Sequence, residues 1–212
     1  MIREGLRWSL VVAVCFLALV GVGASATHYL QEPYNPGFLR FPTITALHVV
    51  LGGLYLALAP LQFVRALRSR HPGYHRRAGR VLVATGLVVG AAGVFMAVVI
   101  PAAGWPERVV VGSFGLLFLL ALIRGFLYAR AGRTALHREW MIRAFAIALA
   151  IATTRLISIS ALLIVDSPTD RQVATLVLVS FTVAFVVHAF LAEAWVRATR
   201  RSVSGAGAAN AT

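Results

Sequence analysis

The sequence has few charged residues and no lysine, and these shortages exclude whole classes of protein. Charged residues make up 13% of the 212 positions, whereas an ordinary soluble domain has roughly 25%. All 20 basic residues are arginines, and only 7 acidic residues oppose them, which gives a formal net charge of +13. A nucleic-acid-binding domain spreads such charge over a water-soluble fold, but here the arginines lie between long apolar runs. The composition therefore argues against a nucleic-acid partner and predicts a membrane protein.

Motifs for common enzyme chemistry are also missing. Cys15 is the one cysteine, so the chain can form no internal disulfide and no cysteine-based zinc site. There is no Gly-rich phosphate loop, no His-Glu-x-x-His zinc motif and no Gly-x-Ser-x-Gly nucleophile elbow. The acidic residues all lie at predicted span ends or in loops, which weighs against an ordinary proton-coupled transporter. The sequence thus assigns no catalytic residue; if the chain is an enzyme, a membrane redox protein is the expected kind.

Six apolar runs dominate what is present. They cover approximately residues 8–28, 44–64, 81–101, 109–129, 141–165 and 173–195. Each has the ~20 residues that a helix needs to cross a bilayer, whereas barrel strands are about ten residues long and alternate polar with apolar. We predict an all-α transmembrane bundle of six spans, forming a single domain over residues 1–201. The small and polar segment 202–212 is predicted to be a disordered tail.

The arginines predict the orientation of the bundle. Two precede the first span, six lie within 65–80, four within 130–143 and three after residue 195, so fifteen share one side. Arg40, Arg108 and Arg171 lie on the other. Because cytoplasmic loops carry the excess of basic residues, both termini are predicted to be cytoplasmic, in a bacterial inner membrane. The first run also resembles a secretory signal ending at Ala24-Ser25-Ala26. An uncleaved span is favoured because the run is long for a signal.

Arg155 is the most unusual residue, because it lies near the middle of the predicted fifth span. Insertion scales place the free energy of an arginine at a helix centre at about +2.5 to +3.5 kcal/mol, and no acidic residue lies at its depth. The guanidinium is therefore expected to point into the bundle. One interpretation is that it uses carbonyls, water and the hydroxyls of Thr153, Thr154, Ser158 and Ser160. The other is that it meets an anion from outside, such as a lipid phosphate, a carboxylate or a haem propionate.

The histidines leave several interpretations open. Gln62 follows His48 by fourteen residues, which places both on nearly the same helix face with Gln62 about 21 Å deeper. Transmembrane cytochromes hold two haems at such a spacing with histidine at both levels, and Gln is a poor haem ligand. The pairs that remain for haem b are His28 with His48 and, on the inner side, His188 with His71, His75 or His137. A neutral imidazole hydrogen-bonded to a neighbouring helix is the simpler account of His48.

A basic cluster is predicted where the third and fifth spans begin. Its members are His75, Arg76, Arg80, His137, Arg138 and Arg143, with Glu139 as counter-ion of Arg138, Arg143 or an arginine of the neighbouring hairpin. One interpretation is a structural clasp between two helical hairpins. A second is a site for an anionic lipid headgroup, since basic residues attract such headgroups by about 1 kcal/mol each. A third is a metal site using His71, His75 and His137, against which the nearby arginines count.

Two local features predict how helices bend and pack. Pro60 removes a helical hydrogen bond inside the second span and predicts a kink there. Gly86 and Gly90 are four residues apart in the third span, a spacing that lets two helices approach closely. Internal packing is favoured over a dimer interface at these glycines.

A family resemblance rests on a short set of motifs. In the second span they are His48, Gly52, Pro60 and Gln62. They continue with His75-Arg76…Gly79-Arg80, the string His137-Arg138-Glu139-Trp140-Met141…Arg143, and Arg155. Over about residues 44–160 the chain thus resembles domain of unknown function 2306, a bacterial family described only as predicted membrane proteins. The resemblance implies a membrane bundle and supplies no mechanism.

These observations predict a polar cavity in the outer half of the bundle, lined by Arg155 and His48. The leading functional hypothesis is a binding or accessory protein that holds an anionic lipid or a small ligand there. One alternative is a b-type haem redox protein with bis-histidine ligation and Arg155 on a propionate. The other is a small-solute transporter.

Overall fold

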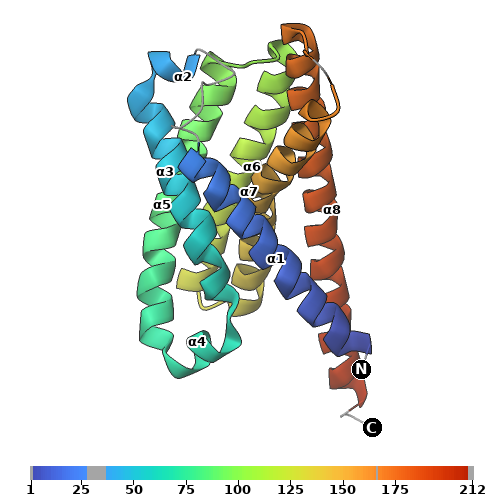
Figure 1. The fold of residues 1–212 in the computed structure, drawn as a ribbon. Coiled ribbons are helices and arrows are strands. Elements are labelled where there is room, and N and C mark those ends of the chain that lie inside the picture. The colour runs from blue at the N-terminus through green and yellow to red at the C-terminus, as the bar shows by residue number, and fades with distance from the viewer. Residues whose placement is uncertain (1, 28–36, 166, 210–212) are drawn as a thin grey trace.

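The computed structural model describes residues 2–27, 37–165 and 167–209, and the regular elements within them are all helical (Figure 1). Their bounds are α1 Ile2–Thr27, α2 Gly37–Arg40, α3 Pro42–Leu58, η2 Ala59–Phe63, α4 Arg65–Arg70, α5 Pro72–Val99, α6 Trp105–Arg130, α7 Thr134–Leu162 and α8 Asp170–Ala209.

Five helical segments are long and apolar enough to cross a membrane. They are Pro42–Phe63, Pro72–Val99, Trp105–Arg130, Thr134–Leu162 and Asp170–Arg200, and Val11–Ala26 is a shorter apolar helix. The predicted all-α bundle is therefore confirmed, with five long candidate spans and one shorter one. The disorder predicted for 202–212 stays a prediction; α8 runs to Ala209, and 210–212 lie outside the described residues.

Helix α7 is the centre of the bundle. It packs against α1, α6 and α8, while contacts of α1 with α3, α3 with α5, and α5 with α6 complete a ring. Ala144, Ala150 and Ala152 of α7 are fully buried, which lets the neighbouring helices come close. Figure 1 shows α1 crossing the bundle obliquely, with α4 and both chain termini at one end and α2 at the other. We call these the α4 end and the α2 end.

The helices continue beyond the apolar runs that predict them. Helix α5 begins at Pro72 instead of residue 81, and α7 begins at Thr134 instead of residue 141. The apolar run marks the part of a helix that suits hydrocarbon, whereas the backbone hydrogen bonds of the helix extend past that part. His75 and His137 consequently lie on helices, one turn inside their first residues.

The helix changes type at Pro60, where the sequence predicts a kink. The α-helical part of this span ends at Leu58, and the chain continues as the 3-10 helix η2 to Phe63. Pro60 has no N–H to donate to the carbonyl four residues before it. A 3-10 helix has about three residues per turn, so the helical register that put His48 and Gln62 on one face is lost.

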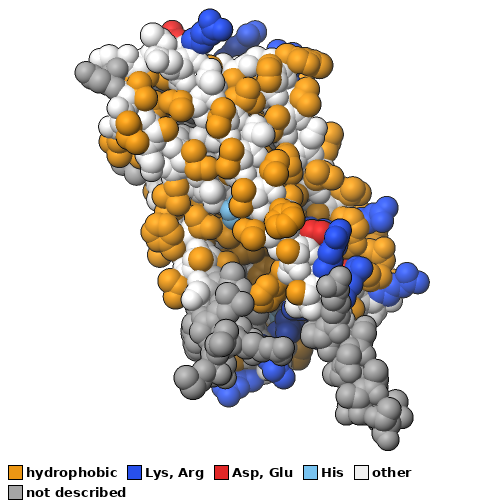
Figure 2. Space-filling model, turned by 90° about the vertical axis from the view of Figure 1, so that its right-hand side faces the viewer, with side chains coloured by type: hydrophobic (Ala, Val, Ile, Leu, Met, Phe, Trp, Pro, Cys, Tyr) orange, Lys and Arg blue, Asp and Glu red, His pale blue; other side chains and the backbone are white. Residues whose placement is uncertain are grey.

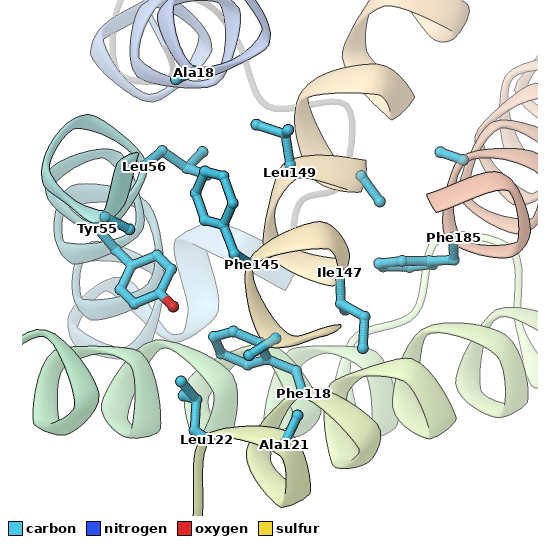
Figure 3. Packing of buried hydrophobic residues seen from close by; sticks show 14 of the residues in the cluster. Ala18, Tyr55, Leu56, Phe118, Ala121, Leu122, Phe145, Ile147, Leu149 and Phe185 are labelled. Atoms are coloured by element: carbon cyan, nitrogen blue, oxygen red, sulfur yellow. The ribbon is translucent and has the colours of Figure 1, made fainter. Parts of the chain in front are cut away.

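Close contact between α5 and α6 depends on glycine. A Cβ atom on Gly86 would lie 2.8 Å from Leu122 Cδ1, and one on Gly90 would lie 2.7 Å from Leu119 Cδ2. Internal packing of Gly86 and Gly90 is therefore confirmed. The adjoining core, shown in Figure 3, brings together side chains such as Tyr55 of α3, Phe118 of α6 and Phe145 of α7.

The outer surface fits a lipid environment. Figure 2 shows hydrophobic side chains over most of the length of one face, with arginines gathered towards its two ends. Large apolar side chains such as Val81, Leu120 and Phe190 are exposed along the helices. Exposed apolar side chains over such an area mark an interaction surface, and on long apolar helices the partner is the bilayer.

Candidate functional site

A cavity of about 130 Å³ lies inside the bundle, in the half nearer the α2 end. Six helices line it, α1, α3, α5, α6, α7 and α8, and five of the lining residues are glycines. The polar side chains among them are Ser25, His48, Tyr55 and Arg155. Arg155 and His48 therefore line one cavity, as the sequence predicts. Gln62 is not among the residues that line this cavity.

Arg155 lies on α7, seven residues before Leu162, and its side chain is half-buried. No described residue accepts a hydrogen bond from its guanidinium or forms an ion pair with it. The acidic side chains for which the structure shows partners bind groups other than Arg155. Glu107, for example, accepts a hydrogen bond of 2.6 Å from the N–H of Ala103. Among the described residues, therefore, no acidic side chain compensates the positive charge of Arg155 at the wall of an otherwise mainly apolar cavity.

Three of the hydroxyls predicted to solvate Arg155 bond other groups, and no described hydroxyl accepts a hydrogen bond from its guanidinium. Thr154 donates to the Ala150 carbonyl at 3.0 Å, and Ser158 donates to the Thr154 carbonyl at 2.6 Å. Thr153 Oγ1 lies 2.8 Å from His188 Nε2. In a helix, Ser and Thr hydroxyls readily bond the carbonyl four residues back, so nearness in sequence to Arg155 does not make them its partners.

His48 is held against α5 by its ring. Its Nδ1 lies 3.0 Å from the Val89 carbonyl oxygen, and because a carbonyl only accepts, Nδ1 carries the hydrogen. The hydrogen-bonded imidazole predicted for His48 is confirmed. Gly93 leaves room for the His48 ring, since a Cβ atom on residue 93 would lie 2.9 Å from His48 Cε1.

Aromatic rings form much of the remaining wall. The rings of Tyr55 and Phe118 meet edge to face with centroids 5.8 Å apart. Phe185 stacks on Phe114 with centroids 4.7 Å apart and planes 11° apart. Figure 3 shows Tyr55, Phe118 and Phe185 coming from three different helices around the same core. Such walls accommodate the apolar body of a ligand, while Arg155 is placed to hold an anionic group.

The acidic residues near the α4 end join α7 to α8. Glu139 forms a bidentate pair with Arg200 and lies 3.8 Å from Arg143. Arg143 also pairs with Glu193 at 2.8 Å, and Glu193 pairs with Arg197 at 3.1 Å. The predicted pairing of Glu139 with Arg143 is confirmed, whereas its bidentate partner Arg200 was missed. The sequence contains a local signal for Glu193 and Arg197, an i,i+4 pair on α8, but none that indicates Arg200 as the partner of Glu139.

The ion pairs near the α4 end do not join the two hairpins of the predicted clasp. These ion pairs link α7 with α8, and Arg80 instead donates from Nε to the Arg76 carbonyl of its own helix at 3.3 Å. Arg138 is exposed. Arg124 and Arg143 lie over Trp140, with guanidinium carbons 5.4 and 5.1 Å from the ring centroid. These distances are within the range of cation–π attraction.

The remaining histidines lie on several different helices. His137 Nδ1 is 2.8 Å from the Gly125 carbonyl, and His75 Nδ1 is buried without a hydrogen-bond partner among the described residues. His188 Nε2 faces Thr153, where a pairing with an inner histidine was predicted. His28 lies outside the described residues. Within the described ranges, no group of three or more His, Cys, Asp or Glu is placed to hold a metal ion.

Comparison with known proteins gives one match. The family described as "Predicted membrane protein (DUF2306)" matches residues 45–196. No curated protein and no solved structure matches the chain. The matched region contains most of α3, the helices from η2 to α7, most of α8, and both His48 and Arg155.

Proposed function

The chain belongs to the DUF2306 family of predicted membrane proteins, and we propose that it binds a small anionic ligand in the central cavity. It is a multi-pass membrane protein whose apolar helices contact the lipid bilayer. The observation that carries the proposal is Arg155, a guanidinium at the cavity wall with no hydrogen-bond or ion-pair partner among the described residues. A bound carboxylate would satisfy it with two parallel hydrogen bonds.

The cavity volume sets the size of this ligand. An engineered protein cavity of about 150 Å³ binds benzene, and the cavity here has about 130 Å³. A carboxylate attached to one ring or to a short chain matches this volume, whereas a whole two-chain lipid does not. The aromatic walls at Tyr55, Phe118 and Phe185 suit a flat apolar body. We therefore narrow the predicted class, anionic lipid or small ligand, to a small amphipathic carboxylate.

We also propose that all six apolar helices span a bacterial inner membrane, with both termini in the cytoplasm. The excess of arginines in the loops at the α4 end supports this orientation. An even number of spans agrees with the placement of both chain termini at that end (Figure 1). In this orientation the cavity lies in the outer half of the membrane.

The two predicted alternatives have less support from the cavity. Bis-histidine haem ligation needs two histidines, and His48 is the one histidine among the described lining residues. Transport needs access from both sides, and the cavity lies in one half of the bundle. Binding is the function that the arrangement of Arg155 and the aromatic walls supports best.

Benzoate is a suitable probe for this proposal. Purified protein should be melted at rising benzoate concentrations, because a ligand at 100 times its Kd stabilises the folded state by about 2.7 kcal/mol. We expect a concentration-dependent rise in Tm for the wild type and none for Arg155→Gln. Arg124→Gln is the matched control, since Arg124 is also an arginine within a candidate span but stacks on Trp140. Equal rises in wild type and Arg155→Gln would contradict the proposal, as would no rise in the wild type.

A further inference from the structure

A second hollow, of about 280 Å³, lies between the α3–η2 segment and α5. We call it the α3–α5 groove. Its walls include Leu54, Leu58 and Val81, whose side chains are exposed on the outer surface of the bundle. It is distinct from the central cavity, with which it shares only Tyr55 among the described lining residues. An exposed apolar groove on a membrane helix pair is accessible to lipid.

The length of the groove matches one leaflet. On α5 its lining residues run from Tyr74 to Thr85. At a rise of 1.5 Å per residue these eleven steps span about 17 Å. Half of a hydrocarbon core of about 30 Å is about 15 Å. With a phosphate at the level of Arg77, the remaining groove to Thr85 is about 12 Å long, so it holds most of the length of one acyl chain within the leaflet nearer the α4 end.

The end of the groove nearer α4 contains a polar group without a partner. Gln62 lines the groove, and its Oε1 is buried with no hydrogen-bond partner among the described residues. It lies 3.4 Å from where a Cβ on Gly79 would be. A buried acceptor left unpaired is destabilising, so a hydroxyl donor supplied by a ligand would be stabilising here.

Positive charge surrounds the same end. Residues 64–80 contain six arginines and no acidic residue, and all six arginines are exposed. Arg77 lies three residues after Tyr74 and four before Val81, so it is within one turn of two groove residues on the same side of α5. No described residue forms an ion pair with Arg77. The charge at this end is complementary to a phosphate headgroup.

We infer that the α3–α5 groove binds one anionic phospholipid with a hydroxylated headgroup, the chemistry of phosphatidylglycerol. Its phosphate lies at Arg77, and one acyl chain lies along Leu54, Leu58 and Val81. The Gln62 side chain turns towards the groove, where its Oε1 accepts a hydrogen bond from a headgroup hydroxyl. This site does not depend on the function proposed for the central cavity.

Native mass spectrometry of the full chain in detergent tests this site, with phosphatidylglycerol, phosphatidylcholine and phosphatidic acid as probes. We expect one phosphatidylglycerol per chain to be retained in preference to phosphatidylcholine. Arg77→Gln should weaken its retention about fivefold, the effect of one basic residue near an anionic group. Arg130→Gln is the control, since Arg130 is also exposed at the α4 end. Equal retention of phosphatidylglycerol and phosphatidylcholine would overturn the inference.

A second set of variants tests the groove itself. Ala78→Trp places a large ring in the groove and should abolish the one-to-one adduct, whereas Leu120→Trp, on the exposed surface of α6, should not. If Ala78→Trp fails to fold, Val81→Trp replaces it, because Val81 is exposed at the rim. Gln62→Leu should lower the retention of phosphatidylglycerol relative to phosphatidic acid, which lacks the glycerol headgroup. Retention of the adduct in the folded tryptophan variant would overturn the inference.

Arg155→Gln separates this site from the central cavity. The variant should keep the phosphatidylglycerol adduct while it loses stabilisation by benzoate. Loss of the adduct in Arg155→Gln would contradict the placement of the lipid in the α3–α5 groove.

Discussion

Two arginines of the same helix should respond in opposite ways to the loss of their charge. Arg155 and Arg143 both lie on α7. Arg143 pairs with Glu193 at 2.8 Å and lies over Trp140, whereas Arg155 has no ion-pair or hydrogen-bond partner among the described residues. Replacement by Met keeps the length and apolar stem of each side chain and removes its charge. In ligand-free protein, Arg155→Met should therefore stabilise the fold and Arg143→Met should destabilise it.

The expected change in the free energy of unfolding depends on where each arginine lies along α7 and how exposed it is. Insertion scales give about 2.5–3.5 kcal/mol for an arginine at a helix centre, and Arg155 lies about 10 Å from the end of α7. We expect Arg155→Met to raise the free energy of unfolding by about 1–2 kcal/mol, since the penalty falls towards the helix end. Arg143 and Glu193 are partly exposed, so solvent screening limits the loss in Arg143→Met to about 1 kcal/mol.

The free energy of unfolding of both variants can be measured on delipidated protein by unfolding in sodium dodecyl sulfate, monitored by circular dichroism. With saturating benzoate the wild type should become more stable than Arg155→Met, because only the wild type is stabilised by the ligand. If Arg155→Met loses stability without ligand, as Arg143→Met does, the guanidinium has stabilising partners within the protein and the reasoning about the cavity fails.

Three further predictions concern packing, the α7–α8 ion pairs and the first helix. Gly93→Ala should push His48 from its place and lower the free energy of unfolding by about 1–3 kcal/mol, the usual range for overpacking. Gly112→Ala, where a Cβ meets nothing within 4 Å, should be nearly neutral in the same melt; similar losses in both would contradict the role of Gly93. Glu139→Gln should speed amide hydrogen exchange in the last turns of α8 around Arg200, and unchanged exchange would show that this pair does not hold the helix. Intact mass should show an uncleaved N-terminus, because α1 lines the cavity; a mass matching cleavage after residue 26 would contradict this.

The sequence sufficed for features that depend on local chemistry. Apolar runs located the long helices because crossing hydrocarbon needs about twenty apolar residues. Pro60 predicted the end of the α-helical segment through its missing N–H. Arg155 pointed to a cavity because a charge within a span must face the interior, and the structure places it on a cavity together with His48.

Other features depend on tertiary contacts that no local pattern contains. Arg200 and Glu139 are 61 positions apart in the chain, and they meet only because α8 packs on α7. The 3-10 register after Leu58 moved Gln62 from the face of His48 to a separate groove. The sequence offered Thr154 and Ser158 as partners of Arg155, but their hydroxyls lie against carbonyls of their own helix, and no described hydrogen bond joins them to Arg155.

The most direct test of the central claim is the distance between a bound carboxylate and the Arg155 guanidinium. Solid-state NMR with carboxyl-labelled benzoate and ¹⁵N-labelled arginine should detect one close pair, with the carboxyl carbon about 4 Å from the guanidinium carbon, as bidentate hydrogen bonds require. Because Arg155→Lys removes only this guanidinium, the coupling should disappear in that variant. A coupling that persists in Arg155→Lys would place the ligand on another arginine and contradict the account.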